Sequence, residues 1–217
     1  MVVVSKQLKV PSLVKQLSDY VEGDIVKIPE NGTPVEFYVA KHDYESGLNG
    51  NGRTLVVRKD CYDLRQWHSS DVNAWATCSM RSWLNSTYLN MLDADLRSLI
   101  GTTKYYYTPG NGNWSVTTRS DAVFLLSAYE LGESESFFNN EGTTLPNATN
   151  YQIANMNGSA VLQWTRSPYT SDTSSAIFLF LTGYAYYHPC IRTDGSRPVF
   201  TLPSTTKFDP DTNIIIG

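Results

Sequence analysis

The chain has 217 residues, of which 41% are apolar and 18% charged, proportions that indicate a folded globular protein and exclude an intrinsically disordered one. Its formal net charge is −4, which argues against nucleic acid or an anionic membrane as the main partner, because both attract a basic protein face. The sequence contains no apolar run of membrane-spanning length and no signal-peptide core, so membrane insertion is not expected.

The first 22 residues are interpreted as a lead-in or attachment segment, and residues 23–217 as one domain. Three apolar residues of the lead-in recur one helical turn apart, at Leu13, Leu17 and Val21. This spacing predicts a short packed helix. A contact between copies of the chain and an attachment to a larger assembly remain open alternatives.

The sequence texture changes to β at Gly23. Two strands are predicted on either side of Asn31-Gly32, a dipeptide that favours a tight hairpin turn. A third strand is predicted from the apolar run that follows Arg53.

Two helices are predicted in the middle of the chain. The first covers residues 78–101, where the apolar side chains follow a helical stripe and Gly101 provides the stop. The second is predicted over residues 118–132, with Thr118 or Ser120 as the N-cap and Gly132 as the end.

Short strands separated by polar loops are predicted for the C-terminal third, over residues 160–167, 176–181, 185–191, 197–203 and the tail. The order of strands, two helices and then many short strands indicates an α+β fold rather than an alternating α/β fold.

The residues that could carry chemistry form no known catalytic or metal-binding motif. The three cysteines are widely spaced and are interpreted as free thiols: Cys61, Cys78 and Cys190. Cys61 and His68 could meet across a turn, but nothing in the sequence supplies a third residue to orient them. No catalytic residue, metal or cofactor is therefore predicted, and four large side chains are interpreted as structural: Trp83, Trp164, Arg166 and Arg197.

The segment Tyr169–Asp194 has an unusual composition. Lys, Glu, Gln, Met and Trp together make up 30 of the 217 residues, yet none of them occurs in these 26 residues. The segment is rich in Tyr and Ser instead, and these residues provide rigid amphipathic contact area and adaptable hydrogen bonds in binding surfaces.

Four phrases of the sequence, in this order, resemble an uncharacterised domain family of bacteria and their phages: "RSWLNSTYLN", "AVFLLSAYELG", "WTRSP" and "GSRPVFTLP". That family is related to the C-type lectin and formylglycine-generating-enzyme folds, so the resemblance implies a C-type-lectin-like α+β fold over roughly residues 23–204. The enzyme branch of this wider group uses a cysteine pair, and no matching pair can be placed in this chain.

Some members of the group resemble the variable proteins of diversity-generating retroelements, in which mutagenic reverse transcription randomises adenines of Asn-type codons. Such codons cannot become Lys, Glu, Gln, Met or Trp codons, the residue types missing from Tyr169–Asp194. The resemblance implies a variable protein that binds a protein or glycan ligand on a bacterial surface, in a phage tail or, before release, in the bacterial cytoplasm. The expected ligand-binding residues are Tyr169, Ser171, Asp172, Ser174, Ser175, Ile177, Phe178, Phe180, Tyr184, Tyr186, Tyr187, His188, Pro189, Ile191, Arg192 and Asp194.

Three alternatives remain open at this point. The chain could be a carbohydrate-active enzyme or a divergent formylglycine-generating-type oxidase on the same scaffold, or a structural component of a virion without a variable face. Homo-oligomerisation is compatible with each of them.

Overall fold

The computed structural model describes residues 13–216. It has a mixed α+β architecture, in which small, mostly antiparallel sheets are combined with a few short helices, as the sequence predicts. Residues 1–12 of the predicted lead-in lie outside the described part of the chain.

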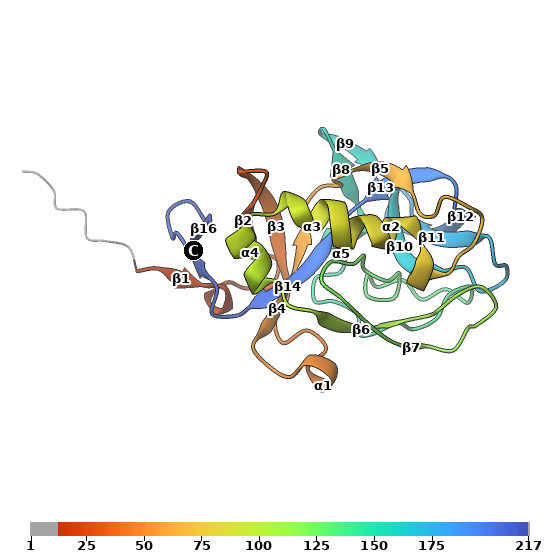
Figure 1. Cartoon of the computed structure of the whole chain (residues 1–217), viewed down its shortest axis with the longest axis horizontal. Coiled ribbons are helices and arrows are strands. Elements are labelled where there is room, and N and C mark those ends of the chain that lie inside the picture. The colour runs from red at the N-terminus through yellow and green to blue at the C-terminus, as the bar shows by residue number, and fades with distance from the viewer. Residues whose placement is uncertain (1–12, 217) are drawn as a thin grey trace, which may run out of the picture.

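A four-stranded antiparallel sheet forms one half of the molecule (Figure 1). Its strands, in spatial order, are β14 (Val199–Pro203), β4 (Arg53–Arg58), β3 (Thr33–Lys41) and β2 (Ile25–Glu30). The turn between β2 and β3 is the predicted one, because Asn31 and Gly32 both have positive φ angles, 50° and 76°. Pro29 is tolerated in β2 because this strand lies at the edge of the sheet.

A five-stranded sheet forms the other half. Its order is β12 (Ala185–Pro189), β11 (Ser175–Leu179), β10 (Gln163–Pro168), β13 (Thr193–Ser196) and β5 (Asp63–Gln66). All residues of β10 and β11 are buried. Both faces of these central strands are therefore covered, which explains why their sequences do not alternate between apolar and polar residues.

Three smaller sheets complete the strands. They are β1 (Lys15–Gln16) with β15 (Lys207–Phe208) and β16 (Ile215–Ile216), β6 (Thr103–Tyr107) with β7 (Thr117–Asp121), and β8 (Ala154–Met156) with β9 (Ser159–Val161). The first of these sheets joins the beginning of the described chain to its end.

The predicted helix over residues 78–101 is confirmed, with a break. It consists of α2 (Ser79–Trp83), a π-helical turn (Leu84–Tyr88), α3 (Leu89–Met91) and, after an extended residue at Leu92, α4 (Ala94–Leu99). The remaining helical elements are α1 (Ser46–Asn49), α5 (Thr149–Gln152) and two 3-10 turns at Leu17–Asp19 and Trp75–Thr77. Figure 1 shows the helices from α2 to α4 running along the molecule in front of both sheets.

The predicted second helix, over residues 118–132, is wrong. Its first residues form β7, and Phe124 pairs with Val199 through two backbone hydrogen bonds of 3.0 Å. Asn85 fixes the extended chain further, because its side-chain oxygen accepts hydrogen bonds from the backbone N–H groups of Ala122 and Val123. These distant partners override the local helix propensity.

The predicted helix in the lead-in is also wrong. Leu17 is buried, but Leu13 and Val21 are exposed, so the three do not share a packed face. The backbone of this segment pairs instead with the C-terminal region, where Leu17 N–H donates to the carbonyl of Thr206 at 2.8 Å.

Candidate functional site

An exposed aromatic cluster lies on and beside the hairpin of β11 and β12. We call it the tyrosine face and define it as Phe137, Tyr169, Phe180, Tyr184, Tyr186 and Tyr187. Tyr184 and Tyr186 are the most accessible of the six, with 54% and 44% of their surface exposed. β11 and β12 lie at one end of the molecule, and β1 and β16 lie at the other (Figure 1).

The rings of the tyrosine face support one another. Tyr187 is stacked between Tyr169 and Tyr186, with ring centroids 3.9 and 4.5 Å apart. Phe137 meets the rings of Tyr169 and Tyr187 edge-on, and Phe180 lies 4.6 Å from Tyr184. Because these rings hold each other in place, they need to lose little conformational freedom when a partner binds.

The hydroxyl groups of the stacked tyrosines gather at the same place. The neighbouring hydroxyls of Tyr186 and Tyr169 raise the pKa of Tyr187 to about 12. Tyr187 therefore keeps its proton at neutral pH, and its hydroxyl can both donate and accept a hydrogen bond. The face thus combines broad ring surfaces with a group of adaptable polar atoms.

The outer edge of β12 is protected against pairing with another strand. The hydrogen bonds from Phe180 to Tyr184 and from Cys190 to Ser174 fix the register, so that the backbones of Ala185, Tyr187 and Pro189 point away from β11. The N–H of Ala185 already donates to Glu133 at 2.9 Å, and Pro189 has no N–H. Two of the three outward backbone positions therefore cannot donate a hydrogen bond to an added strand, which favours recognition through the side chains.

The loop that carries Tyr169 is fixed by Asn73, a fully buried residue. Its side-chain nitrogen lies 2.8–3.0 Å from the carbonyl oxygens of Tyr169, Asp172 and Ser175. Its side-chain oxygen accepts a hydrogen bond from the N–H of Asn111 at 2.8 Å. We call the loop between β10 and β11, which carries Tyr169, the tyrosine loop. The Asn73 amide thus joins the tyrosine loop to the loop between β6 and β7.

The structure divides the sixteen predicted ligand-binding residues into three groups. The exposed residues are Ser171, Tyr184, Tyr186, Pro189, Ile191 and Arg192, and the half-buried residues are Tyr169, Asp172, Ser174, Phe180, Tyr187 and His188. The other four are buried and do not belong to a surface: Ser175, Ile177, Phe178 and Asp194. They are buried because both faces of β11, and the side of β13 that carries Asp194, are covered.

Several of the polar residues are occupied by contacts within the protein. The carboxylate of Asp172 accepts hydrogen bonds from the backbone N–H and the hydroxyl groups of both Ser174 and Ser175. His188 pairs with the buried Asp194 through Nδ1 at 2.8 Å and stacks on Phe178. These side chains shape the loop and strand that support the exposed tyrosines.

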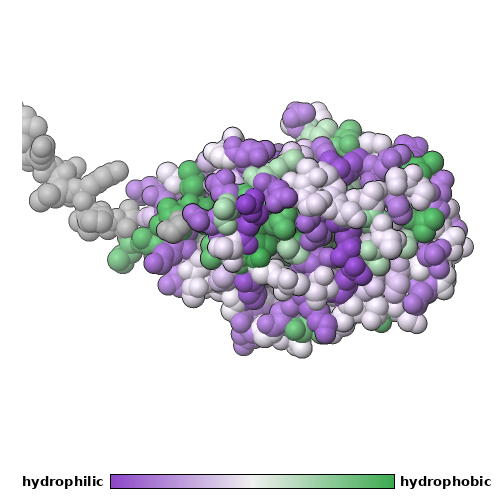
Figure 2. Space-filling model, in the orientation of Figure 1, coloured by the Kyte–Doolittle hydropathy of each residue, from purple (hydrophilic) through white to green (hydrophobic). Residues whose placement is uncertain are grey.

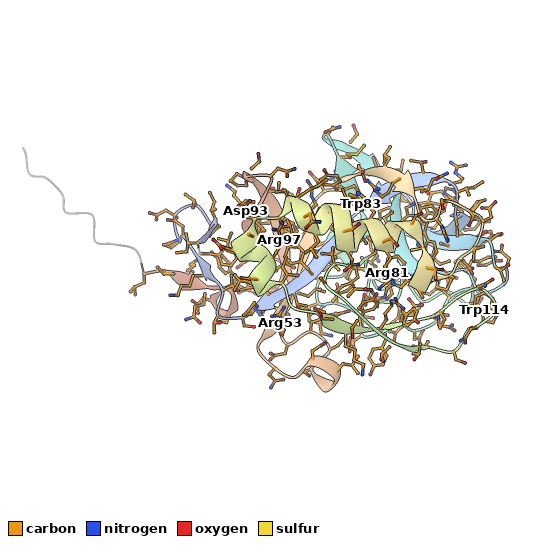
Figure 3. The ribbon with its side chains drawn as sticks, viewed as in Figure 1. Arg53, Arg81, Trp83, Asp93, Arg97 and Trp114 are labelled. Carbon is orange, nitrogen blue, oxygen red and sulfur yellow. The ribbon has the colours of Figure 1, made fainter. Side chains whose placement is uncertain are left out.

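The four side chains interpreted as structural make many contacts. Arg166 pairs with Glu130 at 2.6 Å, with both side chains inaccessible to solvent, and donates to the backbone oxygens of Tyr106, Leu125 and Glu141. Arg197 donates to the backbone oxygens of Arg58, Lys59 and Tyr151. Trp164 donates to the backbone oxygen of Arg65, whose guanidinium lies 3.4 Å from the ring centroid of Trp83 (Figure 3).

The cysteines are free, buried thiols. Burial raises the pKa values of Cys61 and Cys78 to about 12, so both are protonated at neutral pH and neither is an activated nucleophile. Over residues 13–216, no group of three or more His, Cys, Asp or Glu side chains is placed to hold a metal ion, and no helix is long and apolar enough to cross a membrane.

Sequence reasoning missed two residues that matter for the face. Phe137 lies between the predicted helix over residues 118–132 and the first predicted strand of the C-terminal third, and Asn73 lies about one hundred residues before the carbonyl groups that it binds. No local feature of the sequence points to either contact.

Comparison with known proteins gives one family relationship. No curated protein and no solved structure matches the chain. Residues 51–204, which run from just before β4 to just after β14, match a family described as a domain of unknown function (DUF6273). This match covers well over half of the sequence, and the chain therefore belongs to the DUF6273 family.

Proposed function

We propose that the chain is a recognition protein that binds a protein or glycan ligand on a bacterial surface through the tyrosine face. The observation that carries this proposal is the exposure of Tyr184 and Tyr186 within a group of packed rings, on a strand of which two outward backbone positions cannot donate to an added strand. Figure 2 shows white, purple and green residues interspersed at this end of the molecule. Such a surface tolerates water and still offers large anchors to a partner.

The finer proposal for the fold is a C-type-lectin-like domain. It is supported by the pairing of β1 with β15, which brings the ends of the described chain together, and by the long loops that surround the five-stranded sheet. The tyrosine face and the paired ends lie at opposite ends of the molecule (Figure 1). This arrangement suits a phage tail tip or a related bacterial ligand-binding protein, because attachment at one end leaves the other end free.

The finer proposal for the biology is a variable protein of a diversity-generating retroelement. Within residues 169–194, diversification is now expected at the exposed positions, such as Ser171, Tyr184, Tyr186 and Ile191, and not at the buried Ile177 and Phe178. Sequencing the gene from sibling isolates tests this directly. Substitutions concentrated at the exposed positions support the proposal, and substitutions spread evenly along the gene would contradict it.

The binding role is tested with the double variant Tyr184→Ser/Tyr186→Ser, using fluorescently labelled protein and intact bacterial cells in flow cytometry. The variant is expected to lose at least about tenfold in affinity, because an aromatic anchor contributes 1 kcal/mol or more at the centre of an interface. Leu64→Ser is the matched control, because Leu64 is similarly exposed, 45%, but lies on β5 at the opposite edge of the sheet. If the double variant and the control bind equally well, the tyrosine face is not the binding surface.

A further inference from the structure

A groove runs along α4 at the end of the molecule opposite the tyrosine face. One part of it is a cavity of about 400 Å³ whose apolar wall is formed by Leu99, Pro203 and Ile216. A second hollow of about 150 Å³ shares Asp95 and Leu99 with the first and continues towards Pro29. We call the two together the α4 groove, which lies between α4 and the hairpin of β15 and β16.

The α4 groove contains a buried polar atom that needs a partner. Thr206 lines the cavity and has only 5% of its surface exposed. Its hydroxyl oxygen makes no hydrogen bond within residues 13–216, although its backbone N–H and C=O are both bonded. A buried hydroxyl without a partner is unfavourable. This oxygen is itself inaccessible to solvent, so the groove offers an occupant mainly its apolar wall and its charged rim.

Large apolar side chains are also exposed at the N-terminal end of the described chain, on the side of β15 away from β16. Leu13 is 90% exposed and Val21 is 72% exposed, and both flank β1, which belongs to the same small sheet as β16. Figure 2 shows green residues beside purple ones around this end. Exposed apolar side chains of this size are typical of an interaction surface.

We propose that residues 2–10 of a second copy of this chain occupy the α4 groove. This segment reads VVVSKQLKV and combines five apolar side chains with Lys6 and Lys9. The rim of the groove carries the exposed carboxylates of Asp95 and of Asp93, and the second of these is labelled in Figure 3. The apolar residues match the wall of the groove, and the lysines match the carboxylates of its rim.

The direction of the chain favours a second copy over the same molecule. In the register of the small sheet, Lys15 pairs with Phe208, whereas Gln16 and Ile216 both pair with Lys207, which lines the cavity. From Gln16 towards the N-terminus, the chain therefore runs away from the cavity. β1 also lies on the opposite side of β15 from β16, whose Ile216 lines the cavity. Nine extended residues span at most about 30 Å, which is enough to reach a neighbouring molecule without a reversal.

The test is the oligomeric state of the full-length chain, measured by size-exclusion chromatography with light scattering over a series of protein concentrations. The wild-type chain is expected to self-associate. Ser98→Trp fills the groove from an exposed position of α4 and is expected to give monomers. Ser86→Trp is the matched control, because Ser86 is an exposed residue of the same helical region outside the groove, and this variant is expected to associate like the wild type.

A charge exchange provides a second test that does not depend on the folding of Ser98→Trp. Asp95→Lys is expected to weaken self-association by about fivefold, the upper range for an exposed ion pair, and adding Lys6→Glu and Lys9→Glu is expected to restore it. A wild-type chain that stays monomeric would overturn the proposal, because the groove would then be occupied by the chain's own N-terminal segment or by a different protein. Self-association that neither Ser98→Trp nor Asp95→Lys weakens would overturn it as well. Neither result bears on the tyrosine face.

Discussion

Replacing Asn73 by alanine is expected to destabilise the fold and to loosen the tyrosine loop. The side-chain nitrogen of Asn73 lies within hydrogen-bond distance of the carbonyl oxygens of Tyr169, Asp172 and Ser175, and the side-chain oxygen accepts a hydrogen bond from Asn111. The amide has two protons for the three carbonyl groups, so it makes the equivalent of two donated bonds and one accepted bond. At about 1 kcal/mol for each bond, the loss in the free energy of unfolding is about 3 kcal/mol.

This loss can be measured by urea denaturation, followed through the fluorescence of the buried tryptophans Trp67, Trp75 and Trp164. Asn85→Ala is the matched control, since the Asn85 amide donates to two backbone oxygens and accepts from two N–H groups beside the helices. Both variants are expected to lose stability, but only Asn73→Ala is expected to weaken ligand binding as well. A loss below about 1 kcal/mol for Asn73→Ala would refute the account of this loop.

Two further predictions follow from the same structure. Gly110→Ala is expected to destabilise the protein by at least about 2 kcal/mol more than Gly112→Ala. Both glycines have positive φ angles, but only a Cβ at Gly110 would overlap the carbonyl oxygen of Asn73. Equal losses of stability for the two variants in urea denaturation would contradict this prediction. Burial raises the pKa of Glu141 in the folded chain, so the unfolded chain releases this proton first. Stability is therefore expected to fall as the pH rises from about 4.3, the pKa of Glu in an unfolded chain, to the raised pKa of the folded state. Glu141→Gln should remove this part of the decline, and parallel profiles for the two proteins would contradict the prediction.

Features that depend on neighbouring residues could be predicted from the sequence. The hairpin between β2 and β3 needs two consecutive positive φ angles, and Asn31-Gly32 provides them at little cost. The helix beginning at Ser79 follows from a stripe of apolar residues, of which Leu84 and Tyr88 are fully buried. In both places the local preference and the tertiary structure agree.

Features that depend on distant residues could not be predicted. The segment from Ala122 to Leu126 contains only apolar residues, so its sequence does not say whether it is a helix or an extended strand. It is extended because Asn85 and Val199 occupy its backbone groups. Both partners are far away in the sequence.

The candidate site shows the same division. The Tyr and Ser content of residues 169–194 identifies the hairpin that carries Tyr184 and Tyr186, but it does not separate exposed positions from buried ones. Phe178 and Phe180 illustrate this, because they point to the same side of the sheet but differ in burial. Phe178 is buried under Trp164 and His188, whereas Phe180 lies near the end of the hairpin and is only half-buried. Which of the two side chains is buried depends on the neighbours that the folded sheet supplies, and these are not evident from the local sequence.

We infer a division of roles in which the framework carries stability while the exposed part of residues 169–194 carries recognition. Its most direct test is a library in which each of these positions is substituted in turn and the variants are sorted for folding alone. The exposed positions are expected to accept most substitutions, namely Ser171, Tyr184, Tyr186 and Arg192, whereas the buried Ile177 and Phe178 are expected to accept only apolar residues of similar size. Equal tolerance at the exposed and the buried positions, or unfolding on substitution of Tyr184 and Tyr186, would contradict it.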